Sequence, residues 1–311
     1  MQVATLVDMR RSRVMEQPAF PPELVPVFNS LERFENPFQS APAERADWTK
    51  ELKQPVTRLS EVAVAGKTVE YLFFVSCVGY YVSRNQKIAL ALARILQDAG
   101  IRFAILGKEE SFTGDLARRR GREYLAQQLA VKTIEKLNFN NVRKVITAYP
   151  HCFNAIRNEY PQLGGNFEVV HHSQRIDELI AAGRLRLDAA SAIALGDVKY
   201  HDPCYLGRYN RLFDEPRGVN GALAGADLVE MPCNRKQSFC RGGGGGRAFL
   251  KDQGSIRINE ARMREALKDR IGGVDTRSKV RALDLAEPVA GSLKTAPGAL
   301  VVSDARALSQ L

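Results

Sequence analysis

The sequence contains few of the features that mark several protein classes. Its five cysteines in 311 residues are too few for a disulfide-rich secreted scaffold, and their number is odd. The longest apolar run covers residues 71–82, whereas a bilayer span needs roughly 18–20 residues. Arg10, Arg11 and Arg13 interrupt the apolar core that a signal peptide requires. We therefore expect a cytoplasmic protein, where clustered cysteines serve metal or redox chemistry more often than disulfides.

The composition excludes a disordered chain. Hydrophobic residues make up 45% of the sequence, which is enough for a sizeable core. The net charge of +10 is compatible with nucleic acid, an acidic partner or a membrane surface. The densest basic stretch, residues 118–122, has acidic neighbours and no interleaved aromatic residues. We interpret it as a solvated helix face and expect no nucleic-acid partner.

The order of the predicted elements indicates an α/β protein. Prolines interrupt residues 1–64, which predicts an irregular N-terminal extension with short helices near 9–15 and 47–52. From residue 68 onward, apolar runs predict strands that alternate with amphipathic helices, an order that implies a parallel sheet with right-handed crossovers. The expected strands are 69–75, 101–106, 142–147, 197–201, 226–231 and 280–285. The helices between them begin at Ser83, Asp115 and Ser173 and cover 216–223 and 255–268. We predict two related units with parallel-type sheets and flanking helices, 65–195 and 196–311.

Four of the five cysteines follow predicted strands, at the edge where ligands collect in parallel sheets. The interval from Cys77 to Phe112 is 35 residues and that from Cys204 to Cys240 is 36 residues. Both intervals contain one helix and one strand and end in a glycine-containing turn. We interpret this as an internal duplication in which Phe112 occupies a cysteine position. Cys77 and Cys152, which follows the third strand, are then expected to lie close together.

The cysteine-containing segments have an order that can be compared with a known family. They are Cys77-Val-Gly, Tyr149-Pro-His-Cys152, His201-Asp-Pro-Cys204-Tyr-Leu-Gly-Arg208 and Cys240-Arg-Gly-Gly-Gly-Gly-Gly-Arg247. Over residues 68–290 the chain resembles the cysteine-rich CCG domain of heterodisulfide reductase subunits and of glycolate, lactate and glycerol-3-phosphate oxidoreductase iron–sulfur subunits. Residues 6–11 resemble the stretch that follows a ferredoxin-like domain in longer relatives. The extension is then the remnant after such a domain.

The resemblance implies an iron–sulfur oxidoreductase subunit with a 4Fe-4S cluster. Its ligands would come from the matched cysteines, Cys77, Cys152, Cys204 and Cys240, with Cys233 and His201 as additional candidates. Thiolates suit this role because a sulfur shell selects clusters over hard cations. Electrons would pass between a ferredoxin-type or flavin-containing subunit and a thiol or disulfide, quinone or hydroxyacid-linked acceptor. A partner would hold the complex at the inner face of a membrane.

Several ligand positions of the family pattern are missing. Phe112 and Tyr149 replace cysteines in the first repeat, and Arg241 replaces the second cysteine of Cys-Cys-Gly. The final CxxC would fall near residues 277–280, which contain no cysteine, so the second repeat is incomplete. The alternative function is therefore a degenerate scaffold or interaction subunit without a cluster.

Three other functions are disfavoured by what the motifs lack. Residues 242–246 are all glycine, but the Gly-Lys-Ser or Gly-Lys-Thr of a phosphate loop does not follow them. Structural zinc usually has two close ligand pairs, whereas the cysteines here are far apart in the sequence. A Cys–His hydrolase would need an oxyanion site and an orienting acid that the sequence does not identify.

Overall fold

A parallel β-sheet forms the centre of the protein. In the computed structural model, which describes residues 2–17, 19–64, 68–188, 195–251, 256–268 and 282–293, five strands are arranged in the order β1-β3-β2-β4-β5. The strands are β1 (Thr57–Arg58), β2 (Tyr71–Phe73), β3 (Phe103–Ile105), β4 (Lys144–Thr147) and β5 (Glu168–His171). A second parallel pair joins β6 (Gly196–Val198) and β7 (Ala226–Leu228). The predicted α/β class with parallel sheets is confirmed.

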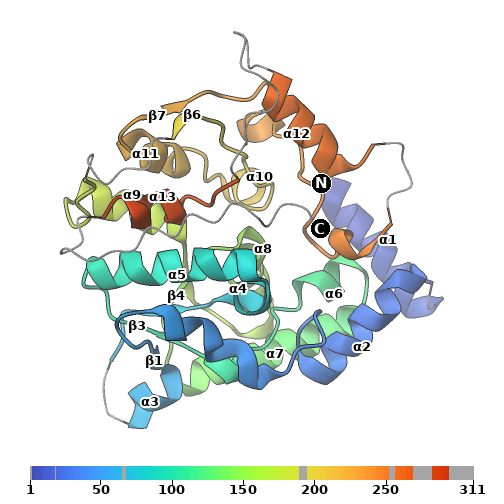
Figure 1. Ribbon diagram of the computed structural model, residues 1–311. Helices are drawn as coiled ribbons and strands as arrows, with labels where there is room; N and C mark the ends of the chain where they lie inside the picture. The colour runs from blue at the N-terminus through green and yellow to red at the C-terminus, as the bar shows by residue number, and fades with distance from the viewer. Residues whose placement is uncertain are drawn as a thin grey trace.

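Helices cover both faces of the main sheet, because successive strand residues point to opposite sides. Phe73 and Ile105 face a core formed with α5 (Ser83–Asp98), α9 (His172–Ala181) and α13 (Ala286–Gly291). Leu72 and Val145 face a core formed with α3 (Leu59–Val64) and α7 (Glu123–Phe139). Figure 1 shows α5 and α9 above the sheet and α7 below it.

The remaining helices lie at the ends of strands and in the N-terminal segment. The longer ones are α1 (Gln2–Glu16), α2 (Val25–Phe34), α4 (Ser76–Tyr81), α6 (Asp115–Arg119), α8 (Pro150–Asn154), α10 (Gly207–Asn210), α11 (Glu215–Ala222) and α12 (Ile258–Lys268). Short turns of helix are η1 (Pro22–Leu24), η2 (Pro42–Glu51), η3 (Gly107–Glu109), η4 (Ala155–Glu159), η5 (Tyr160–Leu163), η6 (Arg235–Gln237) and η7 (Arg247–Phe249). Among the described helices none has the length and apolar character of a membrane span.

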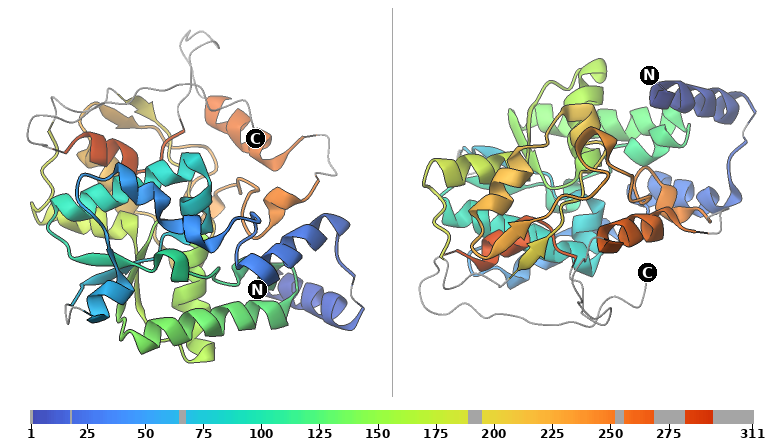
Figure 2. Two further views of the ribbon diagram at one scale, coloured as in Figure 1. Left: turned by 60° about the horizontal axis from the view of Figure 1, so that its bottom comes forward. Right: turned by 90° about the horizontal axis from the view of Figure 1, so that it is seen from above.

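The N-terminal segment is more regular than its prolines suggested. Pro22, Pro26 and Pro42 lie in the first turn of η1, α2 and η2, where a missing backbone N–H breaks no helical hydrogen bond. The segment also supplies edge strand β1 to the sheet, and Trp48 is buried against Phe73. Figure 2 shows this blue segment packed along the outside of the first unit.

Several predicted boundaries are different in the structure. The helix expected from Asp115 is two helices, α6 and α7, separated by Gly121. Strand β5 was not predicted, and His171 rather than Ser173 caps α9, since the His171 ring accepts a hydrogen bond from the Ser173 N–H. Of the strand expected at 280–285, residues 282–285 are not in a strand, and 280–281 lie outside the described residues.

Gly121 sets how closely α1 approaches α6 and α7. Its φ is +87°, and a Cβ there would lie 2.5 Å from the Arg10 carbonyl oxygen. Gly100 also has a positive φ, +66°, but has no neighbouring atom within 4 Å of such a Cβ. Gly121 therefore combines the left-handed conformation with a close backbone contact.

We expect Gly121→Ala to destabilise the protein by about 2–3 kcal/mol and to loosen α1, since both backbone strain and a clash are introduced. Gly100→Ala introduces only the strain and should cost about 1 kcal/mol. Urea unfolding measures both losses, and limited proteolysis reports whether α1 is released. Equal losses in the two variants would contradict the role given to the Arg10 contact.

Candidate functional site

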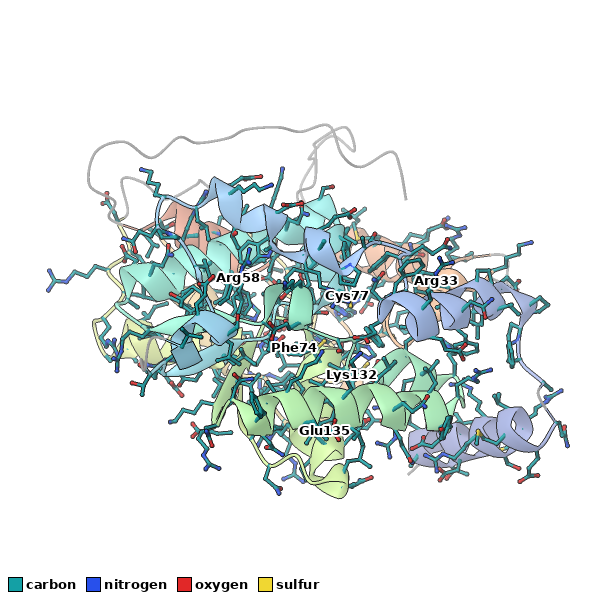
Figure 3. All side chains as sticks on the ribbon, turned by 90° about the horizontal axis from the view of Figure 1, so that it is seen from below. Arg33, Arg58, Phe74, Cys77, Lys132 and Glu135 are labelled. Atoms are coloured by element: carbon teal, nitrogen blue, oxygen red, sulfur yellow. The ribbon has the colours of Figure 1, made fainter. Side chains whose placement is uncertain are left out.

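Cys77 and Cys152 form a buried pair at the carboxyl ends of neighbouring strands. Cys77 lies in α4, which follows β2, and Cys152 lies in α8, which follows β4. The Cys152 Sγ donates a hydrogen bond of 3.3 Å to the Ser76 Oγ, so the second thiol lies against the residue next to the first. Both side chains are about 95% buried or more, and Figure 3 shows the labelled Cys77 within the body of the molecule.

Glu110 holds the turn that carries Cys77. Its carboxylate accepts hydrogen bonds from the N–H groups of Val75 (3.1 Å) and Ser76 (2.7 Å) and from the Tyr80 hydroxyl (2.9 Å). Ser76 has a φ of +68°, a strained conformation for a non-glycine residue that these bonds stabilise. Complete burial raises the pKa of Glu110 to about 7, against the effect of its three hydrogen-bond donors.

The raised pKa predicts a dependence of stability on pH. Because Glu110 ionises at about pH 7 in the folded protein and at 4.5 when unfolded, its contribution is complete below pH 4.5 and is lost as the pH rises through 7. The loss amounts to at most about 3 kcal/mol. We expect Glu110→Gln to flatten this part of the profile, measured by urea unfolding at pH 5, 6.5 and 8. An identical slope in wild type and variant would exclude Glu110 as its source.

The first thiol pair lies in an environment that favours protonated thiols. Burial raises the pKa of Cys77 above its ordinary value and that of Cys152 to about 12. Tyr149 packs between the two main cores, and its hydroxyl donates to the Asn85 carbonyl. Phe112 packs instead against the cluster around α2 and α7. Two protonated thiols with aromatic neighbours are not a ligand set for a four-iron cluster.

Cys204 and Cys240 form a second, accessible pair at the ends of β6 and β7. Cys204 is half-buried and Cys240 is exposed. The two side chains share a hydrogen bond, which lowers the pKa of Cys240 to about 5 while raising that of Cys204. The Gly242 N–H, at 3.3 Å from the Cys240 Sγ, and the nearby Arg208 and His151 also favour the Cys240 thiolate. One thiolate is therefore present at the surface at neutral pH.

The turn before Cys204 is held by an ion pair that the sequence did not identify. Asp202 is buried and accepts two hydrogen bonds from Arg217 (2.8 and 2.9 Å) and one from the Arg235 N–H (2.7 Å). Arg217 lies in α11, between the two cysteines in sequence, and nothing in its spacing marked it. The His-Asp-Pro segment was correctly expected at this turn, but its partner was not.

The additional candidate ligands, His201 and Cys233, belong to a different cluster on α12. The His201 Nδ1 accepts a hydrogen bond of 3.2 Å from Arg262, and burial beside that arginine lowers the pKa of His201 to about 4. Arg262 also donates to the Cys233 carbonyl (2.9 Å), while Glu265 accepts from the Cys233 N–H (2.7 Å). In this arrangement neither residue completes the Cys204–Cys240 pair.

A ring contact joins the two thiol pairs. His151, next to Cys152, lies 4.3 Å from the ring of Tyr205, next to Cys204. The His151 Nδ1 is 2.8 Å from the Asp115 carboxylate, and the Arg119 guanidinium lies over the Tyr205 ring at 4.8 Å. Although burial opposes ionisation, His151 and Arg119 lower the pKa of Asp115. Asp115 thus organises this contact as well as the start of α6.

The glycine-rich segment after Cys240 passes directly over His151. A Cβ at Gly244 would lie 1.9 Å from the His151 Nε2, so any side chain there would collide with the ring. Gly245 contacts the Arg119 side chain in the same way, at 3.2 Å. The close approach of backbone to rings explains the glycines at these positions without a bound phosphate.

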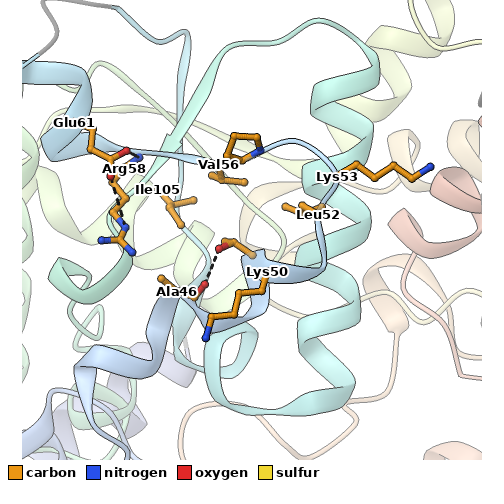
Figure 4. Close-up of a pocket in the computed structure, with 10 residues that line it drawn as sticks. Ala46, Lys50, Leu52, Lys53, Val56, Arg58, Glu61 and Ile105 are labelled. Carbon is orange, nitrogen blue, oxygen red and sulfur yellow. Dashed lines mark hydrogen bonds and ion pairs between the residues drawn. The ribbon is translucent and has the colours of Figure 1, made fainter.

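The largest described cavity lies elsewhere. It has a volume of about 520 Å³ and is lined by η2, β1 and Ile105 of β3. Figure 4 shows Lys50, Lys53 and Arg58 around it, and no cysteine contributes to its wall. The cysteine pairs are therefore not sites at the bottom of a cleft.

The donor set of each thiol pair is smaller than a cluster requires. Within the described ranges, no three His, Cys, Asp or Glu side chains are grouped so as to hold a metal ion. A four-iron cluster takes four thiolates as a rule, and each pair supplies two. Cys204 and Cys240, accessible and partly ionised, fit one edge of such a group, whereas the buried first pair does not.

The match to a known domain agrees with this duplicated arrangement. Residues 71–157 and 198–275 match the cysteine-rich domain CCG, so the chain belongs to this family. The protein is 39% identical to the probable iron-sulfur-binding oxidoreductase FadF of Bacillus subtilis over 85% of this chain and 37% of that protein. It is 38% identical to the EtfAB:quinone oxidoreductase of Syntrophomonas wolfei, over 85% of this chain and 37% of the relative.

A more distant relative comes from the dihydromethanophenazine:CoB--CoM heterodisulfide reductase of Methanosarcina barkeri, of which it is one subunit. The identity is 31% over 76% of this chain and 56% of the relative. The chain thus spans between about a third and just over half of these relatives. No solved structure matches the sequence.

Proposed function

We propose that this chain is an electron-transferring iron–sulfur subunit of the heterodisulfide-reductase-related type. The observation that supports it best is the pairing of Cys204 with Cys240. These residues are 36 positions apart in the sequence, yet their side chains share a hydrogen bond at the ends of two parallel strands. An ionised, accessible thiol pair is suited to soft metals and redox chemistry.

In this proposal Cys204 and Cys240 hold one edge of a 4Fe-4S cluster, which would supply reversible electron storage when bound. The remaining ligands come from Cys233 or His201 after rearrangement, or from a partner chain. Arg208 and the Gly242 N–H stabilise negative charge on the Cys240 sulfur. Cys77 and Cys152 occupy the matching ligand positions of the first repeat, where burial and Glu110 give them the role of a structural core.

The partners follow from the same proposal. The relatives' names point to electron donors such as an electron-transfer flavoprotein or ferredoxin and to acceptors such as a quinone or a disulfide. We infer a flavin-containing or ferredoxin-type redox subunit as the immediate partner, and a thiol or disulfide, quinone or hydroxyacid-linked acceptor. A cytoplasmic position at the inner membrane face, through that partner, is consistent with the relative called a probable membrane-anchored ferredoxin.

Iron and acid-labile sulfide analysis of anaerobically purified protein tests the proposal. We expect a brown protein with about four iron and four sulfide per cluster, whose visible absorbance bleaches with dithionite. A colourless protein that stays colourless after anaerobic reconstitution with iron and sulfide would refute it.

A cluster-free scaffold is the second candidate function. It is favoured by the first thiol pair, which is enclosed by protein, and by the absence of a third donor beside either pair in the part of the chain that the structure describes. In that case the reconstituted protein would remain iron-free but still fold cooperatively.

A further inference from the structure

The surface around the exposed thiol pair is basic and aromatic. Arg208 and Arg241 are exposed, and Phe239 and Tyr209 keep 43% and 44% of their surface in solvent. Tyr209 stacks on Tyr205 at 4.5 Å, and its N–H donates to the Cys204 carbonyl. We call Arg208, Tyr209, Phe239 and Arg241 the thiol rim. Exposed aromatic and arginine side chains are the residues that most often dominate protein–protein interfaces.

A second group of positive charges adjoins the rim across the glycine-rich segment. The Arg120 Nε donates to the Gly245 carbonyl at 2.7 Å, and Arg10 and Arg247 lie close enough that, with burial, they lower the pKa of Arg120 to about 10. We call Arg10, Arg120 and Arg247 the arginine cluster. Three like charges held together raise the free energy of the isolated protein, and an anionic partner would relieve this.

The carboxylates near the arginine cluster are already bound by other cations. The carboxylate that opposes the lowering of the Arg120 pKa is Asp115, which binds both His151 and Arg119. Glu159 binds Arg118 and Arg119. These two carboxylates therefore do not offset the positive charge of the thiol rim beside Cys240.

We propose that the thiol rim and the arginine cluster together form the docking surface for an acidic redox protein, whose carboxylates surround its own electron-carrying edge. Complementary charge accelerates such encounters and orients the partner with Cys240 at the centre of the contact. A protein is favoured over a lipid surface because Arg120 and Arg247 are half-buried, within reach of side chains but recessed from a flat layer. The inference rests on the proposed function only for the identity of the transferred electron, not for the docking itself.

Binding of an acidic plant-type ferredoxin, used as the probe, tests the surface in 50 and 300 mM NaCl. The variant Arg10→Glu/Arg241→Glu reverses two exposed charges without touching a proposed ligand. The control Arg94→Glu/Arg102→Glu makes the same net change on α5 and at the amino end of β3, the opposite sheet edge. We expect about tenfold weaker binding for the first variant at low salt, less than twofold for the control, and loss of the difference at high salt.

Equal weakening in both variants, or no binding of the ferredoxin by the wild type at low salt, would overturn the proposal. Binding to phosphatidylglycerol vesicles or duplex DNA that depends on Arg10 and Arg241, without ferredoxin binding, would identify another partner class and also overturn it. Iron content is measured in the same samples. Iron-free protein that binds with the expected pattern rejects the cluster but keeps the docking surface, whereas iron-containing protein without the pattern rejects only the surface.

Discussion

Replacing Cys204 or Cys240 with serine is expected to remove most of the bound iron and the visible absorbance of the anaerobic protein. A serine oxygen is a harder and more basic ligand than a thiolate, so it competes poorly for cluster iron. The loss should be similar in the two single variants, because the two side chains act as one pair. Iron and sulfide analysis, with circular dichroism to confirm folding, measures the effect.

The chain provides two matched controls for this experiment. Cys233→Ser changes a thiol whose neighbours are Glu265 and Arg262, and we expect it to keep its iron. Cys77→Ser changes a buried thiol and should lower stability by about 1–3 kcal/mol while keeping most of the iron. Unchanged iron in Cys204→Ser would exclude the second pair as a cluster site. Loss of iron in Cys77→Ser with unchanged stability would move the cluster to the first pair.

Removing Arg217 is expected to have the largest effect on stability. Arg217→Met leaves the buried Asp202 carboxylate without the guanidinium that binds both of its oxygens. Breaking a buried ion pair by deleting one partner typically costs about 3–5 kcal/mol, because the other charge stays desolvated. Urea unfolding at pH 7 measures the loss, and the double variant Arg217→Met/Asp202→Asn should recover part of it.

Arg235→Met is the matched control for Arg217. The Arg235 side chain pairs with the exposed Asp214, while its backbone N–H is the group that bonds Asp202. The substitution therefore removes a surface ion pair and keeps the buried contact, and it should cost less than about 1 kcal/mol. A loss in Arg217→Met no larger than that in Arg235→Met would show that the Asp202 pair does not support the turn before Cys204.

The order of strands and helices was accessible from the sequence because it depends on local patterns. The apolar runs at 69–75 and 142–147 contain β2 and β4, and the helical periodicity from Ser83 matches α5. The four motif cysteines were placed beyond strand ends by the same reasoning. Short edge elements were missed, since β1 has two residues and its pairing with β3 is a long-range contact that leaves no periodic signal.

The division of roles between the cysteine pairs could not be derived from the sequence. By motif, Cys77 and Cys204 are equivalent, yet one is buried beside Glu110 and the other lies at an accessible rim. The difference arises because α2, η2 and α8 cover the first pair, whereas the chain after Cys240 continues as glycines that add no covering side chains. Burial and exposure of this kind depend on neighbours that are far away in the sequence.

The α/β class, the duplication and the residues that carry thiol chemistry are all encoded locally. They follow from side-chain periodicity, from spacing and from a specific motif, which are properties of short segments and can be read without a fold. The meeting of Cys204 with Cys240, the contact of His151 with Tyr205 and the neutralisation of Asp202 by Arg217 exist only once the chain has folded. Each depends on hydrogen-bond and packing geometry between distant segments, and a few ångströms determine whether two groups interact at all.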